Sequence, residues 1–289
     1  MMNLRKALLA LLIVSGVSTG SVDARAEPLE STKLYLVMSM AGVTAGSLQL
    51  KIDPADGEVS SSLKMKSQGL FKLLTGYKSF AEARTRPASN GDGPKPVSYD
   101  STYETKSSER KVQIRYDPAD GGITDLGSWK RGKPRKSKVP EELRVDTVDP
   151  LTGVLQVRHW ITELRGGRTG VTNIAVEEAS ASRTFEIFDG RRRYRLNAEL
   201  LERLQIDVDG EDRPAFRFKV QMEPLAGFSS KDMLANWASE GGKRWIELVI
   251  TDEDNPLPVS MTTKGGTLKT TVYLRKVCIG ESRCLKIDN

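Results

Sequence analysis

The sequence predicts a mainly β protein with a long antiparallel sheet and two or three short helices. The main observation is that apolar and polar residues alternate along several segments, so that each strand would bury one face and expose the other. This alternation is typical of antiparallel sheets, because parallel strands are usually covered on both faces. The second observation is that Asp-Pro-Ala-Asp-Gly occurs twice, at 53–57 and at 117–121, between segments of this kind.

The first 26 residues are predicted to be a signal peptide that is cleaved. Arg5 and Lys6 precede an apolar run at 7–17, which is too short to span a bilayer of about 30 Å. The sequence Ala24-Arg25-Ala26 fits a cleavage site. An uncleaved membrane anchor is the alternative, and the absence of a cysteine after the run excludes a lipoprotein. We therefore expect residues 27–289 to form a single β-rich domain in the periplasm.

The clearest alternating segments and turns follow one another along the whole chain. In chain order the segments are 48–52, 111–116, 216–222 and 268–274. In the repeated pentapeptide, proline presets φ at the second turn position and glycine supplies the left-handed residue. Asp189-Gly190, Asp209-Gly210 and Gly265-Gly266 mark three further turns. None of these aspartates belongs to a twelve-residue calcium loop, so the turn interpretation is favoured.

Three segments are predicted to be helices. The first covers 70–77, where apolar residues recur at helical spacing. The second starts with Asp149 as N-cap and Pro150, and ends near Gly166-Gly167. The third begins with a capping box at 229–232 and stops at Gly241-Gly242. We expect the apolar stripes to pack on the sheet, with lipid or partner contact as the alternative; in the second helix the stripe is Leu151, Val154, Val157, Ile161 and Leu164.

Basic residues are concentrated in a predicted loop at 128–140, which also contains Trp129. The formal net charge of the chain is +6, and it is about +4 without the predicted signal peptide, which contains Arg5, Lys6, Arg25 and Asp23. In an exported protein this mildly basic balance indicates an anionic envelope surface and not nucleic acid. A second cluster, Arg191 to Arg193, follows the Asp189-Gly190 turn. The first cluster consists of Lys130, Arg131, Lys133, Arg135, Lys136 and Lys138. It either docks on an anionic membrane surface or forms a solvated loop without a partner, and the sequence leaves both interpretations open.

The sequence indicates no catalytic site, metal or cofactor. His159 is the only histidine, and Glu163 lies one turn further along the polar face of the same predicted helix. A solvent-exposed His–Glu pair is favoured over a metal site, which would need a third ligand. Use of His159 as the general base of an envelope hydrolase is the catalytic alternative.

Both cysteines lie near the C-terminus. Cys278 and Cys284 are separated by five residues that include Gly280, a spacing that suits a hairpin tip. Because the protein is expected to be exported to an oxidising compartment, we predict a structural disulfide between them. A redox or metal site would require a different spacing and more ligands.

Several short motifs, in their order, resemble those of family 3108 of the domains of unknown function, exported proteins of Gram-negative bacteria. These motifs are Tyr35 to Gly46, Gly69 to Leu74, Ala81 to Arg84, Pro96 to Tyr99, Val148 to Leu151, Phe188 to Tyr194, Trp245 to Leu248, Leu257 to Val259 and Gly266 to Leu274. The resemblance covers about Tyr35 to Arg275 and implies a long antiparallel sheet that curls into an open barrel or spiral around one or two helices. The chain is also remotely similar to alphaproteobacterial envelope-integrity proteins. In those relatives the disulfide is expected to join distant parts of the sheet. The resemblance implies no catalytic residues.

Together these features predict a non-catalytic periplasmic binding protein in cell-envelope maintenance that holds a lipid or apolar ligand in its curled sheet. Its partners would be an envelope lipid or an envelope protein, with no nucleic acid. A scaffold that recruits another envelope protein is the alternative within the same class. The residues expected to line the groove are Leu70, Phe71, Leu73, Leu74, Met233 and Trp237.

Overall fold

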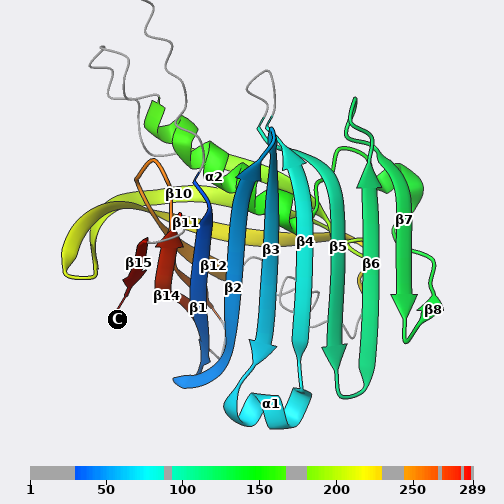
Figure 1. The fold of residues 1–289 in the computed structure, drawn as a ribbon, viewed down its shortest axis with the longest axis horizontal. Coiled ribbons are helices and arrows are strands. Elements are labelled where there is room, and N and C mark those ends of the chain that lie inside the picture. The colour runs from blue at the N-terminus through cyan, green and yellow to red at the C-terminus, as the bar shows by residue number, and fades with distance from the viewer. Residues whose placement is uncertain are drawn as a thin grey trace, which may run out of the picture.

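The computed structural model describes residues 30–87, 93–166, 181–229, 244–265, 269–280 and 283–287. Within these residues the chain forms one antiparallel sheet of 15 strands (Figure 1). The strands are β1 (Thr32–Met40), β2 (Val43–Ala55), β3 (Glu58–Ser67), β4 (Lys78–Arg86), β5 (Lys95–Thr105), β6 (Ser108–Tyr116), β7 (Ile123–Lys130), β8 (Lys133–Pro134), β9 (Ser182–Phe188), β10 (Arg193–Val208), β11 (Glu211–Ala226), β12 (Trp245–Thr251), β13 (Pro258–Lys264), β14 (Thr270–Ile279) and β15 (Arg283–Lys286). The described helices are α1 (Gly69–Thr75), α2 (Pro150–Gly166) and a short 3-10 helix (Glu141–Leu143).

The sheet consists of two meanders joined at one place. Strands β1 to β8 pair in chain order, as do β9 to β14, and β15 pairs with β14 beside this path. The joint is the pairing of β1 with β14, where Leu36 lies opposite Leu274. Strands β8 and β9 remain at the two edges, so the sheet is open. Figure 1 shows β10 and β11 crossing behind the upright strands β1 to β7, and the predicted curled antiparallel sheet is confirmed.

The predicted alternation is present in the strands. The segments at 48–52, 111–116 and 216–222 lie in β2, β6 and β11, and residues 270–274 of the fourth segment lie in β14. In β6, Val112, Ile114 and Tyr116 are buried, whereas the residues between them are exposed or half-buried. Each such strand therefore presents one face to the core, as the period of two requires.

The repeated pentapeptide turns the chain at both places, in two different ways. At its first copy β2 continues to Ala55, and Asp56 and Gly57, with φ of 50° and 77°, form a two-residue hairpin turn. At its second copy the Asp117 N–H donates to the carbonyl oxygen of Gly122 at 2.7 Å, which closes a longer loop. The same five residues thus form a two-residue hairpin turn in one strand connection and a longer loop in the other.

Helix α2 lies between the two halves of the sheet, where it contacts β3 and β4 on one side and β9 on the other. Leu151 and Leu155 join a core cluster formed mostly with the first meander and β14, and Trp160 and Ile161 join a cluster with β9, β10 and β11. The predicted stripe is wrong at Val154, which is 37% exposed, and it omits Leu155 and Trp160. The reason is that a helix covered from two sides buries a wider arc than a single stripe.

Helix α1 connects β3 to β4 beyond one end of the sheet, and none of its residues is buried (Figure 1). The expectation that its apolar stripe packs on the sheet is wrong. The connection between the adjacent strands β3 and β4 spans only 68–77, which is too short for the helix to fold back over the inner face.

Several predictions fall outside the described residues. These are the signal peptide at 1–26, the third helix from residue 230 onward, and Gly266 of the last predicted turn. Neither α1 nor α2 is long and apolar enough to cross a membrane.

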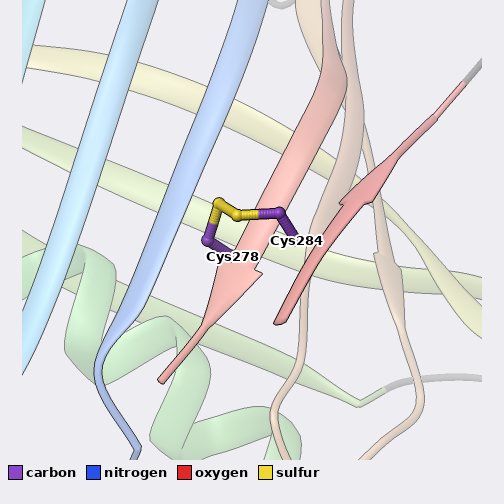
Figure 2. The surroundings of a disulfide bond; sticks show 2 residues. All are labelled: Cys278 and Cys284. Atoms are coloured by element: carbon purple, nitrogen blue, oxygen red, sulfur yellow. A yellow bond between two sulfur atoms is a disulfide. The ribbon is translucent and has the colours of Figure 1, made fainter. Parts of the chain in front are cut away.

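The predicted disulfide is confirmed between Cys278 and Cys284, whose Cα atoms are 4.0 Å apart. Figure 2 shows the bond joining β14 to β15, and the two residues lie directly opposite each other in this hairpin. Gly280 turns the chain with a φ of 64°. The disulfide is therefore local, as the spacing predicts.

Candidate functional site

A cavity of about 470 Å³ lies between the inner face of β3 to β6 and the turn that joins β9 to β10. Its floor comes from the first meander and its roof from the second. We call it the tyrosine–arginine cavity, and its lining residues are Leu63, Tyr77, Ser79, Phe80, Ala81, Tyr99, Ser101, Thr102, Tyr103, Val112, Asp189, Arg191 and Arg192.

The floor of the cavity is apolar and aromatic. Tyr99, Ser101 and Tyr103 are alternate residues of β5 and therefore face the same side of the sheet. The ring of Tyr103 stacks on that of Tyr77, with centroids 6.4 Å apart. Burial raises the pKa of Tyr99, so its hydroxyl stays protonated near neutral pH. The floor thus offers aromatic faces together with a hydroxyl that can donate a hydrogen bond.

The roof is a tight turn built on Asp189. Its carboxylate accepts hydrogen bonds from the backbone N–H groups of Arg191 (2.8 Å) and Arg192 (2.7 Å). Gly190 has a φ of 86°, and a Cβ atom there would lie 2.2 Å from a methyl carbon of Val112. Only glycine therefore allows the turn to approach β6 this closely.

Arg191 and Arg192 line the cavity, Arg110 lies next to them, and Asp189 is the one carboxylate among the lining residues. Arg192 is 3.8 Å from the Asp189 carboxylate, and Arg110 stacks over Tyr103 with its guanidinium carbon 5.9 Å from the ring centroid. Burial, followed by the positive charge of Arg110, lowers the pKa of Arg191. The Arg110 Nε atom is shielded from solvent and has no hydrogen-bond partner in the described part of the chain. The cavity therefore carries excess positive charge beside an apolar floor, an arrangement that suits an anionic group on an apolar molecule.

The residues predicted to line a groove are not at this cavity. Leu70, Leu73 and Leu74 are 61%, 68% and 66% exposed, and Phe71 is half-buried on the same short helix. This expectation is wrong for these four residues, because α1 lies beyond the end of the sheet. The cavity is lined instead by residues on either side of the helix in the chain, Leu63 and Tyr77 among them. Met233 and Trp237 lie outside the described residues.

The predicted basic loop is partly a hairpin. Lys130 is the last residue of β7, Arg131 and Gly132 form the turn, and Lys133 starts β8. Arg135, Lys136 and Lys138 are exposed in the segment that leads to the 3-10 helix. The long central connection therefore begins later than the composition suggests.

His159 lines a second, smaller cavity of about 230 Å³ between α2 and β9. Its Nε2 atom is 3.4 Å from the Glu163 carboxylate, and Glu163 also pairs with Arg183. The predicted His–Glu pair is present, but the imidazole is 34% exposed and lies in the cavity instead of on an open face. The Thr184 hydroxyl in this cavity donates to Asn197 at 3.0 Å. Within the described ranges, no three metal-ligating side chains come together.

The floor of the tyrosine–arginine cavity was not predicted from the sequence. Its one visible indication is the run Tyr99-Asp-Ser-Thr-Tyr103, in which the two tyrosines and Ser101 share one parity. Of the Arg191 to Arg193 cluster, the structure brings Arg191 and Arg192 to the cavity, whereas Arg193 pairs with Glu186 at 3.3 Å. Arg110 lies about 80 residues before this cluster, so no pattern in the sequence links the two.

The described residues define a class of protein, an open and curled antiparallel sheet with a helix held between its halves. Within this class, the chain belongs to the family described as "Protein of unknown function (DUF3108)", whose model matches residues 34–273. The resemblance seen in the short motifs is thereby confirmed.

One similar solved structure is the crystal structure of a beta-barrel-like protein of the domain of unknown function DUF1849 from Brucella abortus. The two chains are 11% identical with a TM-score of 0.48, and the match covers 88% of this chain and 99% of that one. No curated protein matches this chain.

Proposed function

We propose that this protein is a non-catalytic binding protein of the periplasm, active in cell-envelope maintenance, that holds an anionic amphiphile in the tyrosine–arginine cavity. The apolar part of the ligand lies on the aromatic floor, and its anionic group meets Arg191 and Arg110. The observation that carries the proposal is the cluster of three guanidinium groups and one carboxylate beside stacked tyrosines.

The size and chemistry of the cavity support this proposal. Its volume of about 470 Å³ falls in the range of roughly 300–1,000 Å³ that is usual for small-molecule sites. Such sites combine mostly apolar walls with a few placed polar groups. A partly buried guanidinium crowded by a like charge favours an anion, because the anion relieves that repulsion.

The compartment and the partner belong to the same proposal. A disulfide between Cys278 and Cys284 is typical of proteins in oxidising compartments. The basic residues from Lys130 to Lys138 are proposed to contribute docking to an anionic envelope surface. The ligand then comes from the envelope itself, as an acyl lipid with a phosphate or carboxylate group.

Binding of lysophosphatidylglycerol, which carries one acyl chain and one phosphate, tests the proposal. We expect Arg191→Gln to weaken binding about 10- to 100-fold, the usual effect of losing a hydrogen bond to a charged group. Arg84→Gln is the matched control, because this exposed arginine pairs with Glu58 on the same meander, away from the cavity. Equal affinities of the two variants would contradict the proposal.

Binding of the neutral analogue monoacylglycerol distinguishes the contribution of the arginine cluster from that of the aromatic floor. We expect Arg191→Gln to leave its affinity unchanged, whereas Tyr103→Ala weakens both ligands because it removes part of the aromatic floor. His159→Ala should alter neither affinity nor envelope function, since His159 lines the other cavity. An envelope defect from His159→Ala alone would instead favour the hydrolase alternative.

A further inference from the structure

The exposed apolar surface of α1 is unusual for a helix this short. Leu70, Leu73 and Leu74 are spaced so that they share one helical face, and all three are more than half exposed. Gly76 ends the helix in the left-handed conformation, with its N–H donating to the Lys72 carbonyl oxygen at 3.0 Å. The leucines therefore form an apolar protrusion on a capped helix, and contiguous exposed apolar residues mark interaction surfaces.

Lysines surround this protrusion. Lys66 and Lys78 are exposed on the flanking strands and Lys72 within the helix itself. Lys78 also pairs with exposed Glu104, at 3.9 Å. Lys106 binds α1 directly, because its ammonium group donates to the Leu73 carbonyl oxygen and its backbone N–H to that of Thr75. Helix α1 has no acidic residue in its first turn.

The topology adds more positive charge to the same end of the sheet. Because the strands of the first meander alternate in direction, the β3–β4, β5–β6 and β7–β8 connections all lie at one end. The Arg131 guanidinium in the β7–β8 turn donates to the Ser107 carbonyl oxygen in the β5–β6 turn, which ties the two connections together. Exposed Lys106, Arg131 and Lys133 thus extend the basic surface away from α1.

The opposite end of these strands carries the two repeated turns, with exposed Asp56 and Asp120. Arg86 at that end is paired with Glu58 at 3.4 Å. Exposed Glu104 and Glu109 lie at the α1 end, but the exposed basic residues there outnumber them. The first meander is therefore electrostatically asymmetric, and an anionic surface attracts it with α1 facing forward.

From these observations we infer that α1 inserts its three leucines into the surface of an anionic lipid bilayer while Lys66, Lys72, Lys78 and Lys106 contact the phosphates. A protruding helix ringed by lysines on flexible stems suits a fluid surface, whereas a folded partner would offer fixed groups to a groove. Interfacial helices combine the same two elements, an apolar face and flanking basic residues. Docking would also bring the end of the cavity at Tyr77, directly after α1, next to the lipid.

Vesicle co-sedimentation tests this inference with the chain from residue 27 on, which contains every described residue. We expect binding to vesicles of phosphatidylcholine with phosphatidylglycerol, weak binding to phosphatidylcholine alone, and release by added salt. The triple variant Leu70→Ser, Leu73→Ser and Leu74→Ser should bind about 100-fold less tightly, given roughly five-fold for each partly inserted leucine. Leu201→Ser with Leu225→Ser is the matched control, because these exposed leucines lie on β10 and β11.

A fluorescent probe shows whether α1 itself enters the lipid. Leu73→Cys can be labelled selectively, because both native cysteines form the disulfide. We expect the emission maximum of the label to shift to shorter wavelength on anionic vesicles, and its fluorescence to be quenched by quenchers attached to the lipid. Three results would each overturn the inference: vesicle binding without such a shift, equal binding of the triple variant and its control, and no binding of the unaltered chain. The last two results would point to a protein partner or a second copy.

The experiment also separates docking from ligand binding. Arg191→Gln should dock on vesicles like the unaltered chain, whereas the triple leucine variant should still bind monomeric lysophosphatidylglycerol in solution. The inference concerns α1 alone and stands whether or not the cavity holds a ligand.

Discussion

Asp149 is a buried carboxyl at the start of α2. One carboxylate oxygen accepts the N–H groups of Leu151 (2.9 Å) and Thr152 (3.0 Å), and the other accepts the Thr152 hydroxyl at 2.6 Å. Burial raises its pKa to about 6, although these hydrogen bonds oppose the shift. The folded protein therefore holds a proton at this site more tightly than the unfolded chain does.

This raised pKa predicts a pH-dependent stability. The contribution of Asp149 is fully present below pH of about 4, the unfolded pKa, and is lost as pH rises through about 6. Asp149→Asn keeps an N-cap acceptor without the charge. Above a pH of about 7, we expect the free energy of unfolding of this variant to exceed that of the unaltered protein by up to roughly 3 kcal/mol. Near a pH of about 4, we expect little difference between the two proteins. Urea unfolding across this pH range measures the difference, and parallel curves would refute the assignment.

Gly190 predicts a second effect at the scale of one residue. Gly190→Ala places a Cβ atom 2.2 Å from Val112 in addition to requiring a positive φ, so we expect a loss of about 2–4 kcal/mol. Gly132→Ala is the matched control, since its φ is 72° with nothing near the added atom, and should cost about 1 kcal/mol. Thermal or urea unfolding compares the two, and equal losses would show that the turn does not press on β6 as described.

At the residue scale, the sequence predicts what depends on close neighbours in the chain. Asp149-Pro150 predicts the start of α2, and the cysteine spacing predicts a local disulfide, because capping and hairpin closure act over a few residues. Arg110 and Arg191 meet only after the two meanders fold over each other, so no spacing in the chain could bring them together in advance.

Among the elements, the two helices show what periodicity can and cannot predict. Apolar residues at helical spacing predicted both α1 and α2, with the Asp149-Pro150 start added for α2. This spacing did not predict that α1 lies beyond one end of the sheet while α2 is enclosed. That difference depends on the connections: α1 joins two paired neighbours, whereas α2 lies in the crossing between the meanders. The apolar face of α1 therefore remains in solvent.

The β14–β15 hairpin predicts an effect at the element scale. Replacing both Cys278 and Cys284 by serine removes a cross-link over a short loop, which should lower the free energy of unfolding by roughly 2 kcal/mol in the chain-entropy model. Because the strand pairing itself remains, we expect near-identical circular dichroism. A loss of folded structure would instead show that the disulfide holds together more than its own hairpin.

At the scale of the whole molecule, strand alternation predicted an antiparallel sheet, and the resemblance to the family predicted that the sheet curls. Neither predicted that β1 would pair with β14, because this pairing joins segments more than 200 residues apart in the chain. That single joint turns two meanders into one sheet and brings the Asp189–Arg192 turn over β3 to β6. The candidate cavity is a product of this long-range pairing.

Native mass spectrometry with organic extraction, on the chain from residue 27 on purified from a bacterial periplasm, tests the central claim most directly. We predict a co-purified molecule in a one-to-one ratio that carries an acyl chain and an anionic group. The same preparation of Arg191→Gln should have lost most of it, and that of Arg84→Gln should retain it. An empty mass for the unaltered chain, or a bound molecule that Arg191→Gln retains in full, would contradict the account.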